Sequence, residues 1–289
     1  SFVIAGISLI VGLLGVAFFD SFHTWSFHGI GNIDNDIRNL VVLFADPVNV
    51  SIIAISATLV ILIPILAIVY GLFKALFNFK SKDQALGMSA FALWFVALFS
   101  TIAFVAIEAK NYSEAESVSN TIELDEIEDN LQVMFLPNVL GDIDYNNSLE
   151  IDDRWYYVKD NELIYGEVVL DVEKSSSDEY EMKILKSSRG PDNGTAERLA
   201  EDINYNFERS GNDLKLNPYF LTEIDNNWRM QKVEVIIFVP EGKTIDFDEE
   251  SARIAEDYVY ELRDYSPRDV DDFTWIMKNG RLRKVEDEK

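Results

Sequence analysis

The stretch "NNWRMQKVEVIIFVPEGKTI", residues 226–245, determines how the second half of this chain folds. From Val233 to Val239 it holds six apolar residues in seven. The alternating positions that would share one face of a strand are Val233, Val235, Ile237 and Val239. Ile236 and Phe238 make the other face apolar as well, beside Glu234. A strand that is apolar on both faces is typical of the middle of a sheet, so we expect a central strand here, retained for packing.

The residues after this strand predict a turn and more β structure. Val239-Pro240-Glu241-Gly242 suits a type I turn, with proline at its second and glycine at its fourth position. "KTIDFD", residues 243–248, follows as another strand. In "TWIMKNGRLRKV", residues 274–285, Asn279-Gly280 supplies the positive φ of a type I′ hairpin turn. The intervening residues 249–267 allow either a short helix or an extended segment.

Apolar and polar residues also alternate before residue 226, as in a half-buried antiparallel sheet. "GEVVLDVEK" (166–174) and "DEYEMKILK" (178–186) are separated by "SSSD", so we expect them to form a hairpin. "NYNFERSG" and "NDLKLNPYF" (204–220) predict two strands joined by a turn at Gly211. One short helix interrupts the pattern at residues 193–203, with Thr195 as its expected N-cap. The fold class we predict for this half is mainly β with one short helix.

The first half of the chain is of a different kind. Three apolar runs, at about residues 2–19, 52–77 and 86–107, approach or exceed the roughly 20 residues that a helix needs to cross a bilayer. We therefore expect a membrane α-helical region with three transmembrane helices over residues 1–108. A juxtamembrane linker over residues 109–119 and a β-rich domain over residues 120–289 would follow. A signal peptide is the alternative for the first run, although no basic segment precedes it.

Charge separates the halves and predicts their orientation. Residues 1–108 hold four basic and six acidic residues. Residues 109–289 hold 21 basic and 44 acidic residues. Lys74, Lys80 and Lys82 surround the short loop between the second and third runs, while the 20–51 loop has only Arg38 against four acids. The positive-inside rule then places the short loop in the cytoplasm and the β-rich domain outside. We expect a multi-pass protein of a bacterial inner (cytoplasmic) membrane.

The order of these motifs resembles a known family. "NPYF" (217–220) and "WRMQKVEVIIFVPEGK" (228–243) are its most specific features. The chain resembles PspC (phage shock protein C) domain proteins of the Bacteroidetes type, which combine a LiaI/LiaF-like transmembrane region with a C-terminal ToastRack domain. Because apolar sequence begins at Ser1, we expect the N-terminal PspC domain to lie upstream of this fragment. The resemblance implies a sensor or regulator of envelope stress, with PspA-like partners reached through that upstream part.

Two candidate binding sites stand out in the acidic half. "DIDYNNSLEIDD", residues 142–153, has the oxygen spacing of an EF-hand calcium loop, and its candidate ligands are Asp142, Asp144, Asn146 and Asp153. It departs from that loop at Asn147, where glycine is required, and we favour an acidic surface turn. Trp228, Arg229 and Gln231 could form an exposed recognition strip. The alternative, which we favour, is that these side chains pack and hydrogen-bond within the domain.

Composition limits the functions that remain. The strongly anionic second half argues against a nucleic-acid partner, which requires a basic surface. The chain has no cysteine, and its two histidines, His23 and His28, lie in the first half. The second half therefore lacks the residues for a cysteine nucleophile or for a serine nucleophile activated by histidine. We predict no catalytic residue, no metal and no cofactor. The alternatives kept open are an oligomerising membrane scaffold and a glycan hydrolase that uses paired carboxylates.

Overall fold

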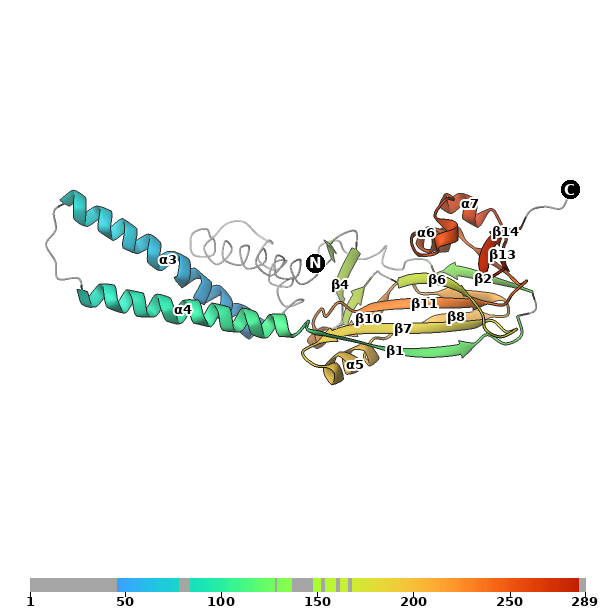
Figure 1. Ribbon diagram of the computed structural model, residues 1–289, viewed down its shortest axis with the longest axis horizontal. Coiled ribbons are helices and arrows are strands. Elements are labelled where there is room, and N and C mark those ends of the chain that lie inside the picture. Colours follow the sequence, from blue (N-terminus) through green and yellow to red (C-terminus); the bar gives the residue numbers. More distant parts are fainter. Residues whose placement is uncertain are drawn as a thin grey trace. The chain divides into compact units, whose positions relative to one another are not determined.

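The computed structural model describes residues 46–77, 84–127, 129–136, 148–151, 154–159, 162–165 and 168–285 (Figure 1). The chain divides into two compact units, Ser1–Ser113 and Glu114–Lys289. The first predicted membrane run, residues 2–19, lies outside the described residues. Each unit is treated separately below.

The first unit contains two long helices, α3 (Pro47–Phe77) and α4 (Gln84–Lys110). In the part of the chain that the structure describes, these two helices are long and apolar enough to cross a membrane, which agrees with the second and third predicted runs. Polar groups join them: Thr101 Oγ1 donates to Ser56 Oγ at 2.9 Å, and Trp94 Nε1 donates to the Val60 carbonyl at 2.9 Å. Such contacts hold membrane helices together where the hydrophobic effect between helices is absent.

The second unit is built around a four-stranded sheet, here called sheet A. Its strands in spatial order are β1 (Glu114–Glu123), β7 (Glu181–Gly190), β11 (Lys232–Val239) and β6 (Val168–Lys174). The predicted central strand is confirmed as β11, which is antiparallel to β7 and parallel to β6. Val233, Val235, Ile237 and Val239 are fully buried, and Ile236 on the other face is 8% exposed.

This order overturns the predicted hairpin between residues 166–174 and 178–186. Both segments are strands, but β11 lies between them. The connecting residues therefore cross the end of β11, where the Ser175 amide donates to the Val239 carbonyl at 2.8 Å. The physical reason is the double-sided apolar character of β11, which is buried most fully when it is flanked by a strand on each edge.

Two further sheets complete the second unit. Sheet B contains, in spatial order, β14 (Arg281–Lys284), β13 (Trp275–Lys278), β12 (Thr244–Phe247), β2 (Asn130–Phe135), β9 (Asp213–Leu216) and β8 (Phe207–Ser210). Sheet C contains β10 (Phe220–Glu223), β5 (Glu162–Tyr165), β4 (Arg154–Lys159) and β3 (Ser148–Ile151). The predicted turns at Gly211 and Asn279-Gly280 are confirmed, since all three residues have positive φ.

Helices cover parts of these sheets. The predicted short helix is α5 (Asn193–Glu201), which packs against β7 and β1, as Figure 1 shows. Its N-cap is Asp192 and not the predicted Thr195, because the Asp192 carboxylate accepts hydrogen bonds from both the amide and the hydroxyl of Thr195. Residues 249–267, for which the sequence allowed either a short helix or an extended segment, are mostly helical. The elements in this part of the chain are α6 (Glu249–Tyr258), the 3₁₀ turn η4 (Tyr260–Leu262) and α7 (Pro267–Asp271). A second 3₁₀ turn, η3, spans Ile224–Asn226.

Two more predictions need correction. The predicted linker over residues 109–119 is mostly strand, because β1 begins at Glu114 and pairs with Gly190 from its first residue. Its polar composition is that of an edge strand rather than of a linker. The predicted type I turn begins one residue later, since the Lys243 amide donates to the Pro240 carbonyl and Gly242 has φ 81°. Positive φ at the third position defines a type II turn, which is why glycine stands there.

Candidate interaction surface

The predicted recognition strip lies in the loop that leads into β11. Asn227 and Met230 both have positive φ, so the backbone is coiled here. The Gln231 side chain holds this conformation from within: its Oε1 accepts from the Arg229 amide at 2.6 Å, and its Nε2 donates to the Asn227 carbonyl at 2.9 Å. The Arg229 carbonyl in turn accepts from the Arg189 amide of β7 at 2.8 Å. The loop is thus fastened to sheet A.

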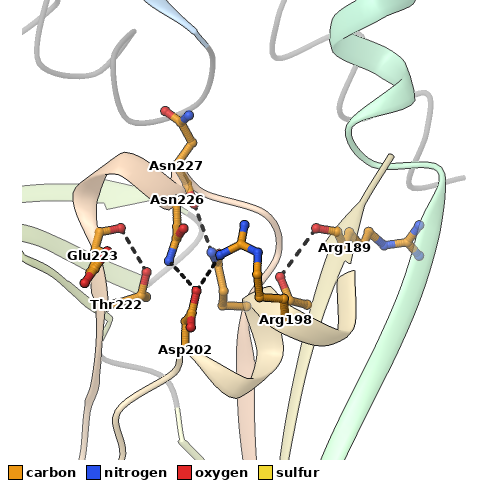
Figure 2. A network of polar contacts seen from close by, with 9 residues as sticks. Arg189, Arg198, Asp202, Thr222, Glu223, Asn226 and Asn227 are labelled. Carbon is orange, nitrogen blue, oxygen red and sulfur yellow. Dashed lines mark hydrogen bonds and ion pairs between the residues drawn. The ribbon is translucent and has the colours of Figure 1, made fainter. Parts of the chain in front are cut away.

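Burial decides between the two interpretations of this strip. Arg229 is 7% exposed and Gln231 is 6% exposed, while Trp228 is half-buried. The exposed-strip interpretation is therefore wrong for Arg229 and Gln231, and the packing interpretation holds. Figure 2 shows the surroundings: Asp202 accepts from Arg198 Nη1 at 2.7 Å and from Asn226 Nδ2 at 3.3 Å. These contacts position the loop and the end of α5 rather than present side chains to a partner.

The calcium candidates cannot be placed on the structure. Asp142, Asp144, Asn146 and Asp153 lie outside the described residues. Among the residues that the structure does describe, no group of three or more histidine, cysteine, aspartate or glutamate side chains could hold a metal ion.

A buried tyrosine connects sheet A to sheet B. Tyr180, which directly precedes β7, is 1% exposed, and its hydroxyl donates to the carbonyls of Asp129 at 2.9 Å and Thr244 at 2.8 Å. Burial raises the pKa of the Tyr180 phenol above its ordinary value of 10.0. The hydroxyl therefore stays protonated and remains a donor, which fixes where β2 and β12 begin.

An open cleft of about 800 Å³ lies between α6 and α7. Its lining residues are Asp248, Glu249, Glu250, Arg253, Ser266, Pro267 and Arg268. Most of its acidic groups already have structural partners: Asp248 caps α6 by accepting from the Ser251 amide, and Glu250 pairs with Arg253. The lining has mixed charge, so this cleft selects no particular ligand.

The β13–β14 hairpin is the most basic stretch of the second unit. Residues 278–284 contain four cations and no acid. Glu241 fixes the hairpin turn, because its carboxylate accepts from the amides of Asn279 and Gly280 and pairs with Lys174 at 3.1 Å. The amide of Asn279 and the ammonium of Lys174 lower the pKa of this carboxyl. The turn is thus held by a group that stays ionised at neutral pH.

A buried carboxylate was missed by the sequence analysis. Glu108, in the last turn of α4, is 1% exposed. Its Oε1 accepts from Asn49 Nδ2 at 2.6 Å, and its Oε2 accepts from Asn111 Nδ2 at 3.0 Å. Glu108 is the last residue of the predicted membrane region, 1–108, where an acid is unremarkable. The polar residues at the start of α3 were the signal that could have found this cluster.

Helix α4 leads almost directly into the β domain. It ends at Lys110, and β1 begins at Glu114, so only residues 111–113 separate them. These three residues form a turn in which the amides of Asn111, Tyr112 and Ser113 donate to the carbonyls three positions earlier. The connection between the helix and the edge strand of sheet A is therefore three residues long, and all three amides are hydrogen-bonded.

Comparison with known proteins agrees with this organisation. A family model described as the PspC transmembrane region matches residues 1–112, and one described as ToastRack found in some PspC matches residues 157–287. No curated protein and no solved structure matches the chain. β1 and β2 precede the ToastRack match, yet they complete sheets A and B.

Apolar helices followed by a β-rich domain define a membrane protein with a large extramembrane unit. The chain belongs to the PspC family, in the type that carries a ToastRack domain at its C-terminal end. The resemblance seen in the sequence is therefore confirmed.

Proposed function

We propose that this protein is a membrane-anchored sensor or regulator of envelope stress, of the phage shock type. The ToastRack domain would lie outside the cytoplasmic membrane and bind a protein of the envelope. The observation that carries the proposal is the short connection between α4 and β1. Because only three residues intervene, a force or a rearrangement in sheet A acts directly on a membrane helix.

The contacts within the membrane unit support transmission of such a change. Helix α4 is joined to α3 near its end by Asn49 and Glu108, and further along by Ser56 and Thr101. A displacement of α4 would therefore move or break defined hydrogen bonds rather than slide along an apolar seam. The output on the cytoplasmic side would go through PspA-like partners of the upstream part. This role requires no catalysis.

Topology is the first test of this proposal. Single cysteines at Ser81 and Ser210 can be introduced into the cysteine-free chain and labelled in intact cells with a membrane-impermeant thiol reagent, after any outer membrane is permeabilised. We expect labelling at position 210 and not at position 81. The reverse pattern would place the ToastRack domain in the cytoplasm and end the envelope-sensing proposal.

A second test addresses the coupling itself. Insertion of a flexible Gly-Ser segment between Ser113 and Glu114 lengthens the connection without touching either unit. We expect such a variant to reach the membrane and fold, but to lose its effect on the envelope stress response. The matched control is the same insertion at Gly211, in the β8–β9 turn. An unchanged response in the first variant would show that α4 and β1 are not mechanically coupled.

A further inference from the structure

The exposed edge of β14 differs in charge from the rest of its domain. Residues 109–289 hold 21 basic and 44 acidic residues, yet Lys278, Arg281, Arg283 and Lys284 follow one another without an acid between them. A cationic segment on a strongly anionic body attracts acidic partners locally while the remainder of the surface repels them. The position of this segment in the fold shows what kind of acidic partner it would suit.

β14 is the last strand of sheet B. It pairs with β13 on one side, and no described strand pairs with its other side. The 3₁₀ turn η4 contacts β14, but no strand among the described residues pairs with the backbone donors and acceptors on that side, which is the arrangement that an added strand requires. In register, Arg281 lies opposite Lys278, and Arg283 lies opposite Ile276. Residues opposite one another point to the same face of a sheet, so Lys278, Arg281 and Arg283 share one face, whereas Lys284, opposite Trp275, lies on the other.

The opposite face of the hairpin is packed into the domain. Trp275 and Met277 are each 1% exposed, and Leu282 is 4% exposed. Trp275 Nε1 also donates to the Val270 carbonyl of α7 at 3.0 Å. With the Glu241 clamp on the turn, this packing gives a rigid edge whose outward cations alternate with buried residues. A preorganised edge loses less conformational entropy when it binds an extended segment.

The arginines themselves are accessible. Arg283 is exposed, and the Arg281 side chain is 69% exposed. The Nε of Arg281 lies 4.0 Å from Glu261 Oε1, a long and solvated ion pair that contributes little. Two residues along a strand span about 6.6 Å, which matches carboxylates at alternate positions of an added strand.

The hairpin also lies far from the point where the chain leaves the membrane helix. Glu114, the first residue of β1, is in register with Gly190, near the loop at residues 226–231. The hairpin attaches at the other end of β11, where the Gly242 amide donates to the Met277 carbonyl. The eight residues of β11 separate the two ends by about 26 Å. The hairpin and the first residue of the second unit thus lie toward opposite ends of sheet A.

We propose that the free edge of β14 binds an extended acidic segment of a partner protein as an added strand, whose carboxylates meet Lys278, Arg281 and Arg283. Main-chain hydrogen bonds supply affinity in this mode, and charge supplies selectivity. The same cations repel the β14 edge of a second copy, which removes symmetric edge-to-edge pairing as the use of this surface. This edge would be the surface through which the ToastRack domain binds its envelope partner, so the proposal rests on the function proposed above.

The test uses the full chain in detergent micelles at about 0.15 M salt, where long-range attraction is screened. The probe is a fluorescent synthetic peptide, TETEVETET, measured by anisotropy. We expect saturable binding that weakens about tenfold or more in the double variant Arg281→Glu, Arg283→Glu. The matched control is Arg209→Glu, an exposed cation on β8 at the opposite edge of the same sheet, which should bind as the wild type does. Unchanged circular dichroism confirms that the variants fold.

A second probe distinguishes strand addition from simple charge attraction. The same peptide, N-methylated at alternate residues, keeps its charge but cannot pair along one edge. We expect its binding to be lost. Equal binding of the N-methylated peptide, or equal competition by inorganic polyphosphate, would show only a general anion site and would overturn the proposal. The proposal would also be overturned if neither peptide bound. None of these results bears on the cysteine-labelling pattern, so a failure here is distinct from a failure of the proposed topology.

Discussion

Asn49, at the start of α3, donates a hydrogen bond of 2.6 Å from Nδ2 to Oε1 of Glu108, in the last turn of α4. The bond joins residues 59 positions apart in the sequence and ties the two membrane helices together at the end where the chain continues into β1. An ionisable side chain buried in a membrane unit is costly unless it is paired, so Glu108 depends on its amide partners.

Replacement Asn49→Ala should weaken this helix pair. The variant removes the Asn49 amide and keeps the hydrogen bond from Asn111 Nδ2 to Glu108 Oε2. A buried acceptor that loses its donor costs about 1–3 kcal/mol. Thermal unfolding of the full chain in detergent should show a lower midpoint. Thr58→Val is the control, because Thr58 Oγ1 donates within α3, to the Ala54 carbonyl. Equal midpoints for Asn49→Ala and the wild type would contradict the structural role given to Glu108.

Two glycines at the ends of one loop should respond in opposite directions to alanine. A Cβ at Gly190 would lie 2.7 Å from the Ala196 amide nitrogen, so Gly190→Ala must displace α5 from β7, at a cost of about 1–3 kcal/mol. A Cβ at Gly194 meets Asp192 Oδ1 at 3.6 Å, an ordinary contact. Because Gly194 is helical, Gly194→Ala should stabilise by about 0.5–1 kcal/mol. Chemical denaturation of both variants measures the two shifts, and a tolerated Gly190→Ala would refute the close packing of α5.

The Glu241 clamp predicts a dependence of stability on pH. Because the pKa of Glu241 in the folded protein is lower than its ordinary value of 4.5, its contribution is present above that value and is lost as the pH falls through the folded pKa. Glu241→Gln should therefore lower the unfolding midpoint at about pH 6, where the native carboxyl is ionised. In acid the two proteins should converge. A midpoint difference that does not change with pH would show that the carboxylate charge is irrelevant to the turn.

Tyr180→Phe removes the hydroxyl that links sheet A to sheet B. The carbonyls of Asp129 and Thr244 lose a donor, and we expect a loss of about 0.5–1.5 kcal/mol. Wild-type stability should also fall as the pH rises above 10.0, because the phenol ionises in the unfolded chain before it does so in the folded one. Tyr260→Phe, at a side chain that is 72% exposed, should change neither property. Urea titrations at neutral and alkaline pH would measure both effects. Burial also raises the pKa of the Tyr205 phenol, so the alkaline loss should shrink in Tyr180→Phe rather than vanish. An alkaline loss of unchanged size in Tyr180→Phe would assign it to Tyr205 or another group.

Local patterns in the sequence were sufficient for much of this protein. The two described membrane helices follow from their length and apolar character, and β11 follows from six apolar residues in seven. The Asn279-Gly280 hairpin follows from the backbone conformation that its turn demands. Each of these signals is contained in one continuous stretch, where chain geometry alone relates the residues.

Tertiary structure decided what depends on distant segments. Strand order is such a property: nothing in residues 166–186 shows that β11 would lie between β6 and β7. The burial of Arg229 and Gln231 is another, since their partners include the Arg189 amide on β7. The Asn49–Glu108 bond likewise joins two helices. Sequence periodicity specifies which face of an element is apolar, whereas the element that covers that face is chosen by packing among all segments at once, and this choice only the folded chain records.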